Sequence, residues 1–129
     1  MHTAPYFTAL GLLAILNSFR VVKLRIKYKV SLGDGGHDDL GRAIRIFGNF
    51  TEYVPLGLVL IAALEFVQAP VWYMHVCGGL LLIGRVLHAM GLLGKGSSAP
   101  RVAGMTMTWI MLLMSSIGVT VFSLLQIRG

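Results

Sequence analysis

The chain is poor in charge, in acidic residues and in cysteine. Only 12% of its 129 residues are charged, and Asp and Glu together number 5. A soluble domain carries roughly 25% charged residues, so the composition argues against a soluble protein. The single cysteine, Cys77, excludes a disulfide within the chain. We expect it to be a small buried residue of the third helix.

Long stretches contain no charged residue at all. Four such runs are Tyr6–Phe19, Tyr53–Leu64, Phe66–Gly84 and Val102–Ile127. A membrane-crossing helix needs about 20 largely apolar residues, and the runs do not alternate apolar with polar residues as barrel strands do. We therefore predict an all-α fold, an integral membrane four-helix bundle forming one domain over 1–129. The expected helices cover about 6–28, 40–66, 70–93 and 100–126.

Glycine and aspartate mark the first connection, and proline interrupts the second helix. The segment SLGDGGHDDLG, Ser31–Gly41, reads as an exposed loop in which Asp38 or Asp39 caps the following helix. It lacks a full set of metal ligands at the required spacing, so no metal is predicted. Pro55 lies inside the second helix, where its missing N–H should produce a kink.

The positive charge is concentrated at one side of the predicted bundle. The net charge is +6, and ten of the 11 Lys and Arg residues fall in Arg20–Arg45 or Arg85–Arg101. These stretches hold the first and third connections, and positive connections stay cytoplasmic. The distribution therefore fits orientation in a membrane and attraction to anionic lipid, not nucleic-acid binding. Both termini should face the non-cytoplasmic side.

Three polar residues lie on one face of the second helix. Arg45, Asn49 and Glu52 have offsets of 0, 4 and 7, and Tyr53 is adjacent. A charged residue at the centre of a membrane helix costs roughly 2.5–3.5 kcal/mol, and such residues usually face the protein interior or a wet cavity. This face therefore predicts a functional site.

The other helices supply further polar residues at the same membrane face. They are Arg20 and Lys23 on the first helix, Arg85 and His88 on the third, and then Lys95 and Arg101. Together they predict a pocket with excess positive charge, one carboxylate, one amide and a phenol. Arginines bind carboxylates through paired hydrogen bonds, and Glu52 can receive an ammonium. Glutathione fits this set of charges, as do other amino-acid-like anions.

Two alternatives compete with a ligand site. Arg45 and Glu52 could neutralise each other and hold helices together, although they lie roughly 10 Å apart along the helix axis. Arg101, in the first turn of the fourth helix, could merely extend to the membrane surface. A helix N-terminus with an arginine is, however, a good anion site, and there it could hold a thiolate by lowering the pKa of the thiol.

Three segments resemble the MAPEG family, the membrane-associated proteins in eicosanoid and glutathione metabolism. They are RIFGNFTEYVPL (Arg45–Leu56), GRVLHAMGLLGK (Gly84–Lys95) and APRVAG (Ala99–Gly104). The resemblance covers essentially the whole chain. It implies a homotrimer of four-helix bundles that binds glutathione between neighbouring subunits, near the cytoplasmic face.

The resemblance also implies residue roles. Glutathione-binding positions of the family match Arg45, Asn49, Glu52, Tyr53, Arg85 and His88, with a looser match at Arg20 or Lys23. Arg101 matches the arginine assigned to thiolate activation. Leu92 and Met105 stand where some members have tyrosines. Without those hydroxyls, a plainer glutathione site is expected.

We therefore predict a membrane-embedded glutathione transferase or peroxidase of a bacterial inner membrane. Its thiolate would attack a lipophilic electrophile that arrives from the bilayer. One alternative is a non-catalytic protein of the same fold that binds lipid or another protein. A small transporter is disfavoured, because the outer halves of the helices are almost free of charge.

Overall fold

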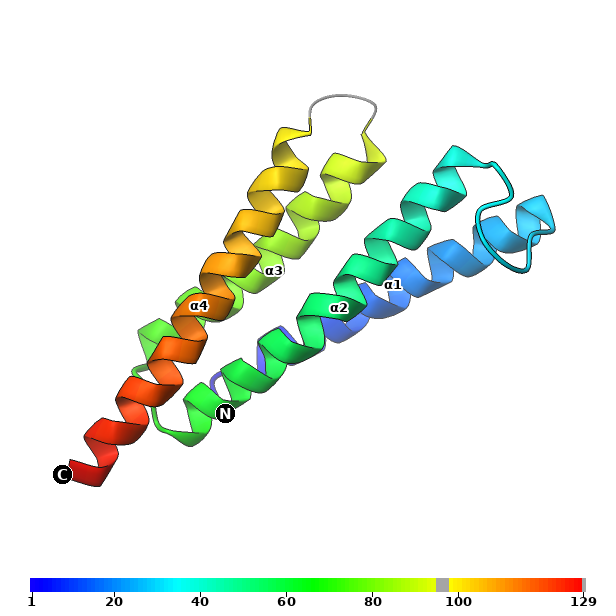
Figure 1. Ribbon diagram of the computed structural model, residues 1–129. Helices are drawn as coiled ribbons and strands as arrows, with labels where there is room; N and C mark the ends of the chain where they lie inside the picture. Colours follow the sequence, from blue (N-terminus) through cyan, green and yellow to red (C-terminus); the bar gives the residue numbers. More distant parts are fainter. Residues whose placement is uncertain (95–97, 129) are drawn as a thin grey trace.

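The computed structural model describes residues 1–94 and 98–128 and is all-helical over these residues (Figure 1). Its helices are α1 (Ala4–Tyr28), α2 (Asp38–Phe66), α3 (Val71–Leu93) and α4 (Ala99–Arg128). Each is long and apolar enough to cross a membrane, with a mean hydropathy of 1.5 to 2.0 over its most apolar stretch. The predicted all-α fold, with four apolar helices of membrane-spanning length, is confirmed.

Proline and charged residues account for several of the helix ends. Pro5 and Pro100 lie in the first turns of α1 and α4, where a missing N–H removes no helical bond. At the end of α1, Lys29 adopts a left-handed conformation with φ 56°. Arg25 then donates from Nη1 to the carbonyls of Ser31 and Gly33, at 3.0 and 3.1 Å. These bonds hold the first connection against α1.

The expected aspartate cap of α2 is wrong. The helix begins at Asp38, two residues earlier than expected, and His37 occupies the cap position with no side-chain cap bond. His37 stacks on Tyr28 with ring centroids 3.8 Å apart, and the Tyr28 hydroxyl donates to Asp39 at 2.7 Å. Both aspartates therefore lie within the first turn, where their charge complements the helix dipole.

The helices form two pairs that share a core at only one end. In Figure 1, α1 accompanies α2 and α3 accompanies α4, and the pairs diverge away from the end that holds both termini. The larger core cluster lies near that end and includes Leu10, Ile61, Leu81 and Met111, one from each helix. The smaller cluster, built on Val21, Leu40 and Ala43, joins only α1 to α2. Towards the first and third connections, α2 therefore shares no hydrophobic core with α3 and α4.

Glycines bring α3 and α4 into backbone contact. A Cβ added to Gly104 would lie 2.6 Å from the backbone N of His88 and closer still to the carbonyl oxygen of Gly84. A Cβ on Gly91 would lie 2.8 Å from the Cβ of Arg101. Small residues at such crossings are typical of packed membrane helices. They hold the first turn of α4 directly against the last turns of α3.

Substituting Gly104 by Ala should therefore destabilise the bundle. The new Cβ would meet backbone atoms, so the two helices must separate, at a cost of about 1–3 kcal/mol. The control is Gly79→Ala, because a Cβ on Gly79 meets nothing within 4 Å and alanine is the better helix former. Thermal unfolding in detergent measures both variants. Equal unfolding temperatures would contradict close packing at Gly104.

Candidate functional site

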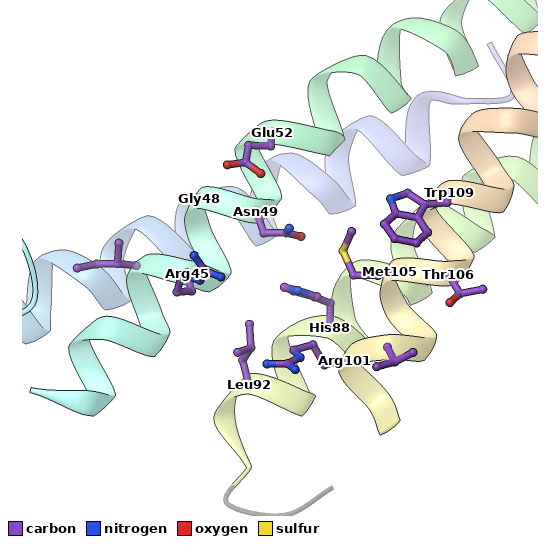
Figure 2. Close-up of a pocket in the computed structure, with 12 residues that line it drawn as sticks. Arg45, Gly48, Asn49, Glu52, His88, Leu92, Arg101, Met105, Thr106 and Trp109 are labelled. Carbon is purple, nitrogen blue, oxygen red and sulfur yellow. The ribbon is translucent and has the colours of Figure 1, made fainter. Parts of the chain in front are cut away.

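A cavity of about 600 Å³ opens between α2 and the α3–α4 pair, where the pairs diverge. Figure 2 shows the residues that line it on three helices. The lining consists of Ile44, Arg45, Gly48, Asn49 and Glu52 from α2, His88 and Leu92 from α3, and Arg101, Val102, Met105, Thr106 and Trp109 from α4. Small-molecule sites in proteins commonly measure roughly 300–1,000 Å³.

The α2 wall carries the polar face expected from the helical spacing. Arg45, Asn49 and Glu52 all line the cavity, and in Figure 2 Asn49 extends towards the α3–α4 side. Arg45 and Glu52 are exposed side chains, whereas Asn49 is half-buried. Gly48 leaves the helix surface open between Arg45 and Glu52, because it has no side chain. This wall presents a cation, an amide and a carboxylate in sequence.

The opposite wall joins α3 to the first turns of α4. His88 is 6% exposed and its ring extends towards α2 (Figure 2). Arg101 is the third residue of α4 and is placed beside Leu92 by the close approach of Gly91. Leu92 and Met105, the two positions that lack a tyrosine, both line the cavity. At those two points the cavity wall therefore consists of the alkyl side chain of Leu92 and the thioether side chain of Met105.

Arg85 lies behind this wall and does not line the cavity. It is 2% exposed and donates to Asn49 Oδ1 and Thr108 Oγ1, each at 2.6 Å. Its Nη2 also lies 3.3 Å from the Gly104 carbonyl oxygen. The Tyr53 ring centroid is 5.7 Å from the guanidinium carbon, a cation–π distance. Arg85 thus ties α2 to both α3 and α4 with neutral partners only.

The charges that line the cavity are not neutralised by each other. Among the charged groups of residues 1–94 and 98–127, the one ion pair joins the N-terminal ammonium to Glu65, 3.8 Å apart. That pair lies at the opposite end of α2. The alternative in which Arg45 and Glu52 pair with each other is therefore wrong. Arg45, Glu52 and Arg101 are instead available to a ligand.

The remaining predicted residues lie elsewhere. Tyr53 lies beside Arg85 rather than on the cavity wall. Arg20 lines a separate cavity of about 500 Å³ with His37, Arg42 and other residues. Lys23 is exposed on α1 and lines neither cavity. Lys95 lies outside the described residues.

Several residues of the site were not predicted. Trp109, Thr106 and Val102 form much of the α4 wall, and Thr108 supports Arg85 from behind it. The sequence places Val102, Thr106 and Trp109 on α4 with Arg101. In a largely apolar helix, however, the sequence does not show which face of the helix lines the cavity. Thr108 is one of several hydroxyl residues in α4, such as Thr106 and Ser115, so the sequence does not single it out as the partner of Arg85.

The comparisons with known proteins agree on one family. A model of the MAPEG family matches residues 3–121. The chain is 42% identical over 114 residues to the inner membrane protein YecN from two strains of Escherichia coli, covering 88% of this chain and 86% of each relative. No solved structure matches the chain. Because the match reaches into all four helices, the protein belongs to the MAPEG family.

Proposed function

We propose that the protein is a membrane-embedded glutathione transferase, with glutathione peroxidase activity as a variant of the same chemistry. The observation that carries this proposal is the cavity between α2 and α4, lined by Arg45, Asn49, Glu52 and Arg101. It offers two cations and one carboxylate that form no ion pair with any described residue. Glutathione has two carboxylates, one ammonium and a thiol, so its charges complement the cavity.

Each charged group of glutathione would bind a cavity side chain of opposite charge. Arg45 and Arg101 bind carboxylate or thiolate groups, since guanidinium donates paired hydrogen bonds to anions. Glu52 receives the ammonium, and Asn49 adds a neutral contact. His88 contributes polar ring atoms from α3 to the same cavity. Membership of a family that includes glutathione transferases supports this assignment.

Arg101 is the residue that activates the thiol. It lies in the first turn of α4, where the helix dipole adds positive partial charge. Both effects favour the thiolate over the thiol. The thiolate sulfur then attacks an electrophilic carbon, forming a carbon–sulfur bond while the leaving group departs with its electron pair. The thiol proton passes to water.

The α4 wall receives the electrophile. Val102, Met105 and Trp109 give this side an apolar surface next to Arg101. No tyrosine hydroxyl stands at Leu92 or Met105, so the site offers no phenol there to bind or protonate the substrate. These features favour a lipophilic substrate whose leaving group needs no acid from those positions.

We further propose a homotrimer in a bacterial inner membrane, with both termini on the non-cytoplasmic side. The inner-membrane location is supported by the name of the YecN relatives and by the four spans. The orientation follows from the cationic first and third connections. In the trimer, Arg20 or Lys23 of a neighbouring subunit would approach the glutathione site, since neither lines the cavity of its own chain.

Arg101→Ala should lower turnover more than glutathione affinity. Loss of a charged hydrogen bond of about 1.5–3 kcal/mol to the thiolate corresponds to a fall in rate of roughly 10–100-fold. The rate of the variant should recover as the pH rises, because more of the glutathione thiol is then deprotonated without help from Arg101. The measurement is the pH profile of conjugation with 1-chloro-2,4-dinitrobenzene in detergent, beside Arg101→Lys, which keeps a cation. Equal rates in wild type and Arg101→Ala would remove Arg101 from the mechanism.

Glu52→Gln should weaken glutathione binding by about tenfold while leaving turnover at saturation unchanged, because only the ammonium contact is lost. Calorimetry with glutathione and with its analogue lacking the amino group gives a double-mutant cycle. The analogue should bind both proteins equally. Glu65→Gln, a change at the other end of α2, is the control. Unchanged affinity in Glu52→Gln would exclude the ammonium contact.

The orientation can be tested with alkaline phosphatase, which is active only outside the cytoplasm. A fusion after Gly129 should be active, whereas an insertion after Gly94, in the third connection, should be inactive. This outcome follows from the cationic first and third connections. The reverse pattern would place the candidate site at the non-cytoplasmic face.

A further inference from the structure

Arg85 is a buried cation whose hydrogen-bond partners are all neutral. Its Nη1 donates to Asn49 Oδ1 at 2.6 Å, and its Nη2 donates to Thr108 Oγ1 at 2.6 Å. Thr108 in turn donates to the Gly104 carbonyl at 2.9 Å. With 2% of its surface exposed, the Arg85 side chain is held from α2 and from α4 at once.

The chemistry of guanidinium fixes the orientation of the Asn49 amide. Arginine only donates hydrogen bonds, so the Asn49 atom that meets Nη1 must be the carbonyl oxygen. The oxygen and nitrogen of an asparagine amide are otherwise hard to tell apart. Here the donor decides between them. The Asn49 NH₂ group is therefore the end that is free to face the cavity, and it donates to no acceptor among the described residues.

We infer that Arg85 and Thr108 are positioning residues that lock Asn49 as a hydrogen-bond donor to the ligand. This inference rests on the proposed glutathione function and adds the kind of ligand group that Asn49 binds. A fixed NH₂ group selects a carboxylate or carbonyl oxygen. It rejects an amide N–H or an ammonium at the same point, because two donors would face each other without an acceptor.

This assignment differs from a direct role of Arg85 in binding. Arg85 does not line the cavity, and its two terminal nitrogens already meet acceptors. Its Nε is buried and has no hydrogen-bond partner among the described residues. A ligand in the cavity would therefore meet Asn49 and not the guanidinium behind it. Arg85 acts on the ligand only through the orientation of that amide.

Asn49→Asp tests the inference by exchanging the donor for an acceptor while keeping the oxygen that Arg85 needs. The probes are glutathione and two analogues, one with the glycine carboxylate and one with the glutamyl carboxylate converted to a carboxamide. Calorimetry should show glutathione binding at least roughly tenfold weaker than in wild type. One of the carboxamides should bind the variant more tightly than it binds wild type, which identifies the group that Asn49 contacts.

The measured quantity is the affinity for glutathione divided by the affinity for each carboxamide. General loss of structure would lower both affinities without changing their ratio. Asn49→Ala, which has neither donor nor acceptor, should weaken both kinds of ligand without such a reversal. If wild type binds glutathione and Asn49→Asp keeps the same preference for carboxylate, the donor role is wrong while the proposed function stands. If wild type does not bind glutathione at all, the proposed function fails.

A second arm tests the orientation without any ligand. Asn49→Asp retains an acceptor for Arg85, whereas Asn49→Leu leaves a buried guanidinium N–H unpaired. The leucine variant should unfold at least about 4 °C below the aspartate variant in detergent. Thr108→Val should likewise loosen Arg85 and weaken glutathione binding, and Thr108→Ser, which keeps the hydroxyl, should restore it. Equal unfolding temperatures for Asn49→Leu and Asn49→Asp would overturn the inference.

Discussion

The close approach of α3 and α4 determines where the polar side chains of the candidate site are located. Backbone contact at Gly84, Gly91 and Gly104 leaves no room for side chains between the two helices. The first turn of α4, with Arg101, is thereby placed against the last turns of α3. The same contact brings Thr108 and the Gly104 carbonyl to the Arg85 guanidinium. The packing of two helices thus sets the geometry of the whole polar wall.

The second constraint is electrostatic. A buried guanidinium is costly unless its donors are satisfied, and the two terminal nitrogens of Arg85 meet an amide, a hydroxyl and a carbonyl rather than a carboxylate, while its Nε has no partner among the described residues. Its positive charge is therefore not neutralised inside the protein. Arg45 and Arg101 add to it along the cavity. The protein thus maintains a positive potential at the point where α2 separates from α3 and α4, and an anionic ligand would be attracted there.

The sequence was sufficient to predict the fold and one wall of the site. Charge-free runs identify four spans, and the helical offsets of Arg45, Asn49 and Glu52 place these residues on one face. Helical periodicity describes a single helix, however, and does not determine how far apart two helices stand. For this reason the burial of Arg85 and the role of Thr108 could not be predicted from the spacing of polar residues.

A shared membrane face does not decide which cavity a side chain lines. Arg20 and Lys23 lie at the same face as Arg45 and Arg101, yet within one chain Arg20 lines a separate cavity and Lys23 lines neither. The aspartates of the first connection favour a helix cap by their residue type, whereas His37, stacked on Tyr28, occupies the cap position and α2 begins at Asp38. In both cases the local pattern does not record the contacts that a side chain makes in the folded chain.

Pro55 lies within the part of α2 that is anchored in the larger core. Ile61 and Leu64 belong to that core on one side of the proline, and Phe50 and Val54 belong to it on the other, next to Asn49 and Glu52. The missing N–H lowers the bending stiffness of the helix at that point. Core residues nevertheless flank the proline on both sides, and Asn49 is bonded to Arg85, so the polar face is held in place at this softer point of the helix. The helical pitch sets the spacing of Arg45, Asn49 and Glu52, and these contacts keep the three side chains on the wall that faces α4.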